Sequence, residues 1–200
     1  MELTDKQTAI LELKLSELQF RLSKTVRLAI TLEKQSLDTP TQMSFGKHIV
    51  LYEEIALNED QSHIAAQYLE QTATYLMAMT IKEALVKIYI DPKNNPDKNV
   101  VAAYQISRMI RNAFAHSPIM PVWSIDTDCK NKKFVIDNVI ALDTSNIDQK
   151  QFDWRHYGGL LALFKLSKYV RIQLLKDTDV GKNRTPLRKK RKSICKVISF

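Results

Sequence analysis

Glycine and cysteine are scarce in this chain, and long apolar runs are absent from it. Only 4 of the 200 residues are glycine, which argues against glycine-rich phosphate loops and against turn-dense all-β folds. Neither GxGxxG nor GxxxxGK(S/T) occurs, so we expect no Rossmann or P-loop nucleotide site and no cofactor. No apolar run reaches the roughly 18–20 residues that span a bilayer, so we expect no membrane partner.

The few cysteines and the acidic pairs give no sign of a metal site. Cys129 and Cys195 are far apart and form no CxxC or zinc-ligand pattern, so a reducing cytoplasm is the simplest compartment. The helix-like amino terminus carries Glu2 and Asp5, unlike a signal peptide. The acids of Asp126-Thr127-Asp128 are interpreted as turn residues. We therefore predict a cytoplasmic protein without a metal.

The net charge of +8 is concentrated at one end of the chain. Residues 181–200 hold eight basic residues and no acid, which leaves residues 1–180 formally neutral. Such a tail adds salt-sensitive, sequence-independent attraction to RNA, DNA or an anionic membrane surface. A solvated, partly disordered terminus is the alternative. We predict a domain of residues 1–176 and a basic, partly disordered tail of residues 177–200.

Helical spacing of apolar residues dominates the domain. The pattern predicts four long helices, over residues 4–37, 59–90, 98–116 and 153–176. In the first helix the apolar positions are Leu11, Leu15, Leu18, Leu22, Val26 and Ile30. Asn58 is the expected N-cap of the second helix, because Gln61 completes a capping-box pattern with it.

Two segments between the helices are not helical in pattern. Residues 42–57 predict an irregular crossover with a short helix near 50–56. Val122–Ile125 and Lys133–Ile136 flank the polar turn Asp126–Lys132, which predicts a β-hairpin whose second arm extends through residues 139–142. The expected fold class is mainly α: an up-and-down bundle of about four long helices, with a small β-hairpin inserted before the last helix.

The third helix carries the best-defined chemistry of the chain, in Arg111-Asn112-Ala113-Phe114-Ala115-His116. An arginine can hold a scissile phosphate and its developing charge. A histidine can move the proton of a ribose 2′-OH or of the leaving oxygen near neutral pH. The alternative is that Arg111 is a solvated charge and that His116 caps the carboxyl end of its helix.

A helical wheel separates this motif from the core. The apolar arc expected to face the core contains Ala102, Ala103, Ile106, Met109, Ile110, Ala113 and Phe114. The opposite side contains Tyr104, Gln105, Arg108, Arg111, Asn112, Ala115 and His116. We expect this polar face to meet solvent or a partner, and Asn112 to touch His116 as an i, i+4 pair.

The residues from Ile110 to His116 resemble the signature of the HEPN superfamily (higher eukaryotes and prokaryotes nucleotide-binding domains). That signature is an arginine, usually followed by a polar residue such as asparagine, and then a histidine. HEPN domains are α-helical up-and-down bundles with the motif late in a long helix, and many are metal-independent endoribonucleases. The resemblance covers the bundle, about residues 1–176, but its specific part is these few residues; the hairpin and the tail lie outside the family's general pattern.

The resemblance implies roles for the three polar residues of the motif. Arg111 would bind or polarise the phosphate, and His116 would act as acid or base in attack by the ribose 2′-OH. Asn112 would orient His116 or the phosphate. The family also implies a homodimer in which both motifs line one cleft, and a toxin or defence setting with an antitoxin or another partner protein.

Further residues are candidates for contact with RNA. Tyr104 and Arg108 share the polar face of the motif helix. Arg155 and His156 belong to an aromatic segment, residues 152–159, that either stacks on bases and contacts phosphates or anchors the last helix. In the tail the candidates are Arg188, Lys189, Lys190 and Arg191.

Three hypotheses about function follow from the sequence. The first is a HEPN-like homodimer that cleaves RNA without a metal through 2′-OH attack. The second is a non-catalytic, HEPN-like dimeric module that binds RNA, a nucleotide or a partner protein. The third is a helical scaffold in which the motif residues form a dimer contact.

Overall fold

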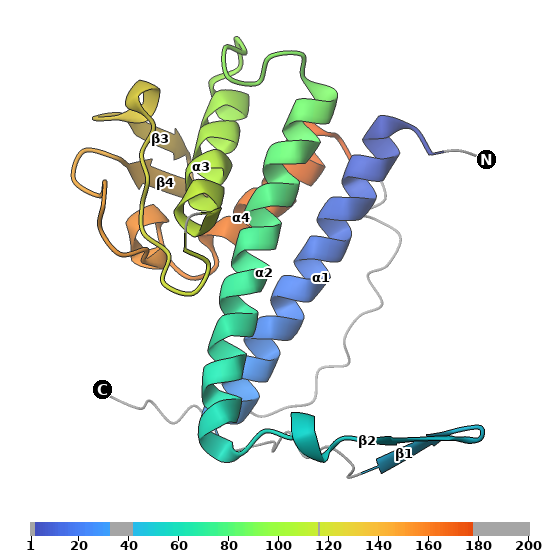
Figure 1. Cartoon of the computed structure of the whole chain (residues 1–200). Coiled ribbons are helices and arrows are strands. Elements are labelled where there is room, and N and C mark those ends of the chain that lie inside the picture. The colour runs from blue at the N-terminus through green and yellow to red at the C-terminus, as the bar shows by residue number, and fades with distance from the viewer. Residues whose placement is uncertain (1–2, 33–41, 116, 178–200) are drawn as a thin grey trace, which may run out of the picture.

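Three long helices form the body of the molecule (Figure 1). The computed structural model describes residues 3–32, 42–115 and 117–177. The long helices are α1 (Asp5–Thr31), α2 (Glu59–Ile88) and α3 (Lys98–Ala115). α2 packs against α1 on one side and against α3 on the other (Figure 1). The predicted mainly α bundle is therefore confirmed.

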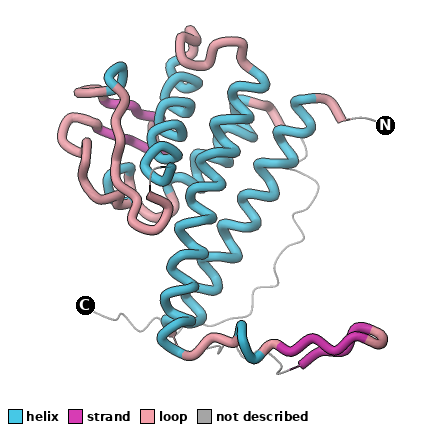
Figure 2. Tube along the Cα trace, viewed as in Figure 1, coloured by secondary structure: helices cyan, strands magenta, loops and turns pink. Residues whose placement is uncertain are grey.

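The remaining elements are short (Figure 2). They are the hairpins β1 (Gln42–Phe45) with β2 (His48–Leu51) and β3 (Lys133–Ile136) with β4 (Ile140–Asp143), the helix α4 (Ala162–Tyr169), a π-helical turn over Val170–Leu174, and 3-10 turns over Glu53–Ile55, Thr127–Cys129 and Trp154–Tyr157. α4 packs against both α1 and α2. In the described ranges, no helix has the length and apolar character needed to cross a membrane.

The first two helices begin at capping boxes. The backbone N–H of Gln61 donates to Asn58 Oδ1 at 2.9 Å, as the sequence predicted. Thr4 caps α1 in the same way, through Gln7. These caps satisfy backbone groups that have no partner inside the helix. α1 ends at Thr31, and positions 33–37 of the predicted helix lie outside the described residues.

The predicted hairpin before the last helix is present, but one of its arms was assigned wrongly. Its strands are β3 and β4, whereas Val122–Ile125 is not a strand and Val122 forms only an isolated bridge with Gln151. The turn lies at Asn138, which adopts φ 60°, and not at 126–132. Asparagine tolerates this left-handed conformation, so the chain reverses there and pairs Ile136 with Ile140.

A second hairpin, β1–β2, was missed by the prediction of an irregular crossover over residues 42–57. Gly46 supplies φ 64° at a two-residue turn, and a glycine there is a recognised hairpin signal. The expected short helix is reduced to a 3-10 turn at Glu53–Ile55.

The last predicted helix, over residues 153–176, is interrupted. Asp153 caps only the 3-10 turn Trp154–Tyr157, and α4 starts at Ala162. Gly158 and Gly159 have φ of 101° and 108°, which a right-handed helix does not contain. The glycine pair therefore ends the first turn.

A buried ionic cluster joins α1 to the end of the described chain. Arg171 donates to both carboxylate oxygens of Glu17 at 3.0 Å, and to Asp177 Oδ2 at 2.6 Å. All three residues are buried. Buried charges are tolerated only when paired and hydrogen-bonded in this way.

Candidate functional site

The motif helix α3 turns its apolar arc inward, as the wheel predicted. Every member of that arc is buried: Ala102, Ala103, Ile106, Met109, Ile110, Ala113 and Phe114. Arg111 and Asn112 lie on the other side and are half-buried. His116 lies outside the described residues, so its predicted contact with Asn112 stays a prediction.

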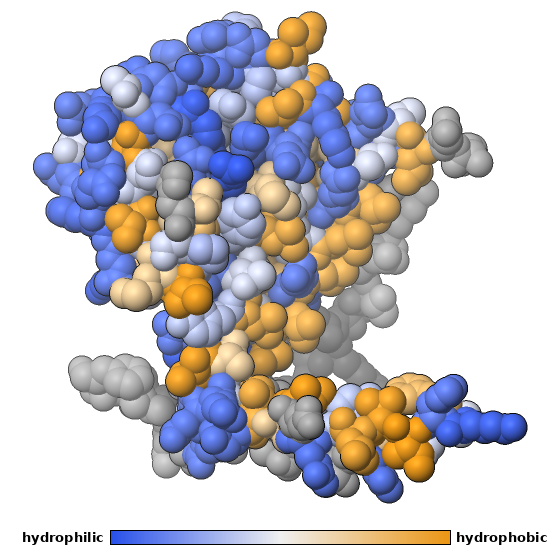
Figure 3. Space-filling view, viewed as in Figure 1, coloured by the Kyte–Doolittle hydropathy of each residue, from blue (hydrophilic) through white to orange (hydrophobic). Residues whose placement is uncertain are grey.

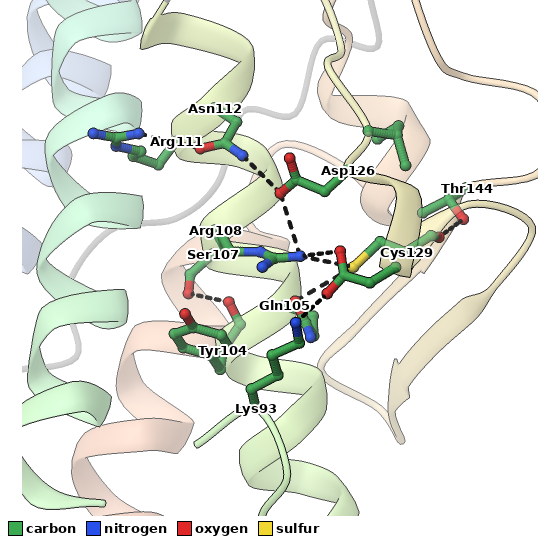
Figure 4. Close-up of polar contacts among 12 residues, drawn as sticks. Lys93, Tyr104, Gln105, Ser107, Arg108, Arg111, Asn112, Asp126, Cys129 and Thr144 are labelled. Atoms are coloured by element: carbon green, nitrogen blue, oxygen red, sulfur yellow. Dashed lines mark hydrogen bonds and ion pairs between the residues drawn. The ribbon is translucent and has the colours of Figure 1, made fainter. Parts of the chain in front are cut away.

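Part of the polar face is covered, which corrects the prediction that the whole face meets solvent or a partner. Gln105 is buried, and the side chain of Arg108 is only 16% exposed. The segment from Asp126 to Cys129 lies over both residues (Figure 4). A buried arginine needs carboxylate partners, and this segment provides two of them.

Arg108 is neutralised by the covering segment. Its Nη2 atom lies 2.8 Å from Asp128 Oδ1, 3.2 Å from Asp126 Oδ2 and 3.1 Å from Cys129 Sγ. Lys93 pairs with the other oxygen of Asp128 at 2.8 Å. The hydrogen bond from Lys93, together with Arg108, lowers the pKa of Asp128 to about 2. Burial raises the pKa of the Cys129 thiol, against the effect of Arg108.

Asn112 links Arg111 to this network. Its Oδ1 accepts a hydrogen bond from Arg111 Nη1 at 3.2 Å, and its Nδ2 donates to Asp126 Oδ2 at 3.1 Å (Figure 4). The opposite amide orientation would place a donor against the guanidinium and an acceptor against the carboxylate. Asn112 therefore orients Arg111, and its predicted orientation of His116 or the phosphate stays a prediction.

Arg111 differs from Arg108 in its electrostatic environment. Among the described residues, no carboxylate forms an ion pair with Arg111, and its side-chain hydrogen bond is to the neutral amide of Asn112. An arginine held in this way keeps its full charge and most of its five donors for an anion.

A small, mainly apolar cavity lies where α3 ends. Its volume is about 180 Å³, and its lining is Thr72, Tyr75, Phe114, Ala115 and Pro118. Ala115 is also the residue before His116. The cavity therefore opens next to the end of the motif, with an aromatic ring and a hydroxyl at its edge.

Tyr104 lies on the same helix face as Arg108. The guanidinium carbon of Arg108 is 6.0 Å from the centre of the Tyr104 ring, and the ring is half-buried. Since Arg108 is already paired with two acids, Tyr104 and Arg108 together form a surface with little positive charge to attract a phosphate.

Arg155 and His156 have structural partners of their own. Arg155 Nε donates to Asp153 Oδ2 at 2.8 Å, and its guanidinium lies over the Trp154 ring. His156 Nδ1 accepts a hydrogen bond from the buried Trp123 indole at 2.9 Å. The His156 contact agrees with the interpretation that this segment anchors its surroundings.

A larger cavity lies beside Arg155. It has a volume of about 370 Å³, and its charged lining residues are Lys24, Arg27, Glu70, Asp153 and Arg155. Lys24 pairs with Glu70 across it. The positive side chains there are largely matched by acids, so the cavity carries little net charge.

The remaining predicted contacts cannot be placed in this site. Arg188, Lys189, Lys190 and Arg191 lie outside the described residues. Among those that are described, no three His, Cys, Asp or Glu side chains gather as metal ligands would.

The sequence did not predict four residues of this site: Lys93, Asp126, Asp128 and Cys129. Asp126 and Asp128 were interpreted as turn residues; Asp126 does precede the 3-10 turn Thr127–Cys129, and Asp128 lies within it. Arg108 was the signal that could have indicated them. It lies one turn before Arg111 at the border of the buried arc, where an arginine needs carboxylate partners.

Comparisons with known proteins add no relative. No protein-family model matches the chain, and neither the curated proteins nor the solved structures compared with it contain a match.

Proposed function

We propose that this protein is a HEPN-like, metal-independent endoribonuclease that acts in the cytoplasm, in a toxin or defence setting. The observation that carries the proposal is the contrast between two arginines on one helix. Arg108 is neutralised by Asp126 and Asp128, whereas Arg111 has no carboxylate partner among the described residues. An oriented guanidinium without a counter-ion is suited to bind a phosphate.

The proposed reaction uses Arg111 and His116 as the resemblance implies. The Arg111 guanidinium binds the non-bridging oxygens of the scissile phosphate and stabilises the charge that develops on them. His116 removes the proton of the ribose 2′-OH. The P–O2′ bond forms as the P–O5′ bond breaks, which gives a 2′,3′-cyclic phosphate and a 5′-hydroxyl.

The leaving O5′ must receive a proton, and one histidine cannot be base and acid at the same moment. In the homodimer that the resemblance implies, His116 of a second copy supplies this proton. Asn112 fixes the direction of Arg111, and Asp126 fixes Asn112. Such support keeps the guanidinium in one geometry throughout the reaction.

RNA cleavage by the purified protein in EDTA tests this proposal. We expect cleavage by the wild type and none by His116→Ala, with helical circular dichroism unchanged between the two. His48→Ala, at an exposed position of β2, is the matched control and should cleave normally. Equal cleavage by His116→Ala and the wild type would exclude the mechanism.

One observation favours the second hypothesis, a non-catalytic HEPN-like module that binds RNA, a nucleotide or a protein. Two of the predicted RNA-contact residues, Arg108 and Arg155, are paired with acids, which weakens their attraction to phosphates. RNA affinity would then depend on the tail. A salt-dependent affinity that is lost on deletion of residues 181–200, without any turnover, would support this module in place of the nuclease.

A further inference from the structure

The helix α1 is apolar on two opposite faces. One face packs into the bundle through Ala9, Leu13, Phe20 and Ile30, all of them buried. A surface helix of a soluble protein normally has a single apolar stripe, which faces its own core, so a second apolar face indicates a further contact.

The second face is a row of exposed leucines, which we name the leucine seam. It consists of Leu11, Leu15, Leu18, Leu22 and Leu32, exposed by 45%, 56%, 55%, 61% and 48%. The positions advance by four and three residues in alternation, and Thr25 and Ala29 fill the remaining steps of the same heptad pattern. Figure 3 shows apolar residues gathered along α1.

The geometry of the helix sets the two faces opposite each other. The seven positions of a heptad repeat are labelled a to g, and the seam leucines occupy a and d. In the same repeat, the buried Leu13 and Phe20 occupy position f, and the buried Ala9 and Ile30 occupy position b. Positions b, c and f lie across the helix axis from a and d. The bundle therefore cannot cover the seam with the same contacts that bury α1.

We propose that the leucine seam joins two copies of this chain through a parallel pairing of α1 with α1. This inference goes beyond the proposed function and does not rest on it. The heptad pattern is self-complementary, since each leucine meets the same leucine of the second copy across a two-fold axis.

The size of the seam fits a dimer contact. Five leucines about half exposed offer an apolar surface on the order of 500 Å², which marks an interaction site on a soluble protein. Two copies together would bury on the order of 1,000 Å², near the lower limit of specific interfaces.

The flanking residues select the parallel orientation. In that pairing Gln7 faces Glu12 of the second copy, and Lys14 faces Gln19, so no like charges meet. An antiparallel pairing would set Lys14, whose charge is partly offset by Asp177 at 3.2 Å, against Arg21 of the second copy. Like charges across such a seam are unfavourable.

The hairpin β1–β2 extends the apolar surface at the end of the bundle. It projects from the region where α1 ends (Figure 1), and Met43, Phe45, Ile49 and Leu51 are exposed. An isolated two-stranded hairpin is marginally stable in water, so contact with a second copy would stabilise it.

Association through α1 leaves the motif face of α3 accessible. α2 packs against both α1 and α3, so the seam and the motif belong to helices on opposite sides of α2 (Figure 1). The proposed cleavage needs a second contact that brings two motifs together, so the seam dimer and the motif dimer are separate contacts between copies.

Sedimentation equilibrium of the full chain tests the seam. Replacement of two seam leucines, in Leu15→Lys with Leu18→Lys, should halve the molar mass of the assembly and weaken its self-association at least 100-fold. Lysine is a good helix former, so α1 should persist in circular dichroism. The matched control, Ile90→Lys with Leu161→Lys, adds the same charge at exposed sites outside the seam and should leave the mass unchanged.

Cysteine cross-linking tests the orientation. In a Cys195→Ser background, Leu18→Cys should give a disulfide-linked dimer with diamide as the oxidant, and Ile90→Cys should not. A wild-type mass that does not respond to the seam variants would overturn the proposal. So would a failure of Leu18→Cys to cross-link, or a monomer whose seam is covered by residues 178–200 or by another protein.

Discussion

Asn112 donates a hydrogen bond from Nδ2 to Oδ2 of Asp126 at 3.1 Å, and this bond ties the motif helix to the segment that covers it. The same carboxylate oxygen lies 3.2 Å from Nη2 of Arg108. Asp126 thus contacts both Arg108 and Asn112 of α3. Through Asn112 it fixes the orientation of the Arg111 side chain.

Removal of the Asp126 carboxylate should lower RNA cleavage about 10-fold, because Asn112 loses its anchor and Arg111 loses its fixed direction. Asp126→Ala should show this loss in kcat under single-turnover conditions. Asp128→Ala is the matched control, since it removes a carboxylate from the same segment without touching Asn112. Equal losses in both variants would show that only the pairing of Arg108 matters.

Stability at acid pH should depend on Asp128. Its pKa is lowered from the ordinary 3.8 to about 2, first by the hydrogen bond from Lys93 and then by Arg108. A carboxylate with a lowered pKa in the folded state stabilises the protein above its unfolded pKa. That contribution is lost as the pH falls from about 4 to about 2.

Thermal unfolding between pH 2 and pH 7 measures this effect. Asp128→Asn should lower the melting temperature at pH 7 and show a weaker fall between pH 4 and pH 2 than the wild type does. Lys93→Gln should reproduce part of the change, because it removes the largest cause of the shift. A curve for Asp128→Asn parallel to that of the wild type would contradict the assignment.

Removal of one partner from the buried ionic cluster should destabilise the bundle strongly, because it leaves a buried charge without its counter-charge. Glu17→Ala leaves Arg171 buried with only Asp177, and breaking a buried pair costs about 3 kcal/mol. Glu12 is also on α1 and forms a half-exposed pair with Lys87 of α2, so Glu12→Ala should cost less than about 1 kcal/mol. Urea unfolding of both variants measures the difference.

His156 should be structural and His116 catalytic. His156→Ala leaves the buried Trp123 indole without its acceptor and should lower the free energy of unfolding by about 1–2 kcal/mol. Its RNA cleavage should stay within about twofold of the wild type at a temperature where both are folded. A stable but inactive His156→Ala variant would instead place His156 in the reaction.

The sequence predicted those features that depend on periodicity and on local caps. The apolar arc of α3 is buried as a 3.6-residue repeat requires, and the capping box at Asn58 is a contact over three residues. The hairpin was assigned partly wrongly because several apolar runs could supply the first arm. The chain reverses at Asn138, whose left-handed conformation lets Ile136 pair with Ile140.

The environment of the motif could not be predicted in the same way. The contacts of Arg108 and Asn112 with Asp126 join residues 14 or more positions apart, and no spacing rule predicts them. The helical wheel places Arg108 and Arg111 on one polar face. In the fold, Arg108 is neutralised by carboxylates, whereas Arg111 has no carboxylate partner among the described residues. The exposure of the leucine seam was equally hidden, because helical spacing alone does not say which of two apolar faces is covered.

The most direct test of cleavage through 2′-OH attack begins by mapping one cleavage site in an RNA in the presence of EDTA. The reaction is then repeated with a 2′-deoxy nucleotide at that site. We expect a 2′,3′-cyclic phosphate end on the natural RNA and no cleavage of the deoxy substrate. Arg111→Ala and His116→Ala should both be folded and inactive. No cleavage of any RNA by the wild type, or cleavage of the deoxy substrate, would contradict this mechanism.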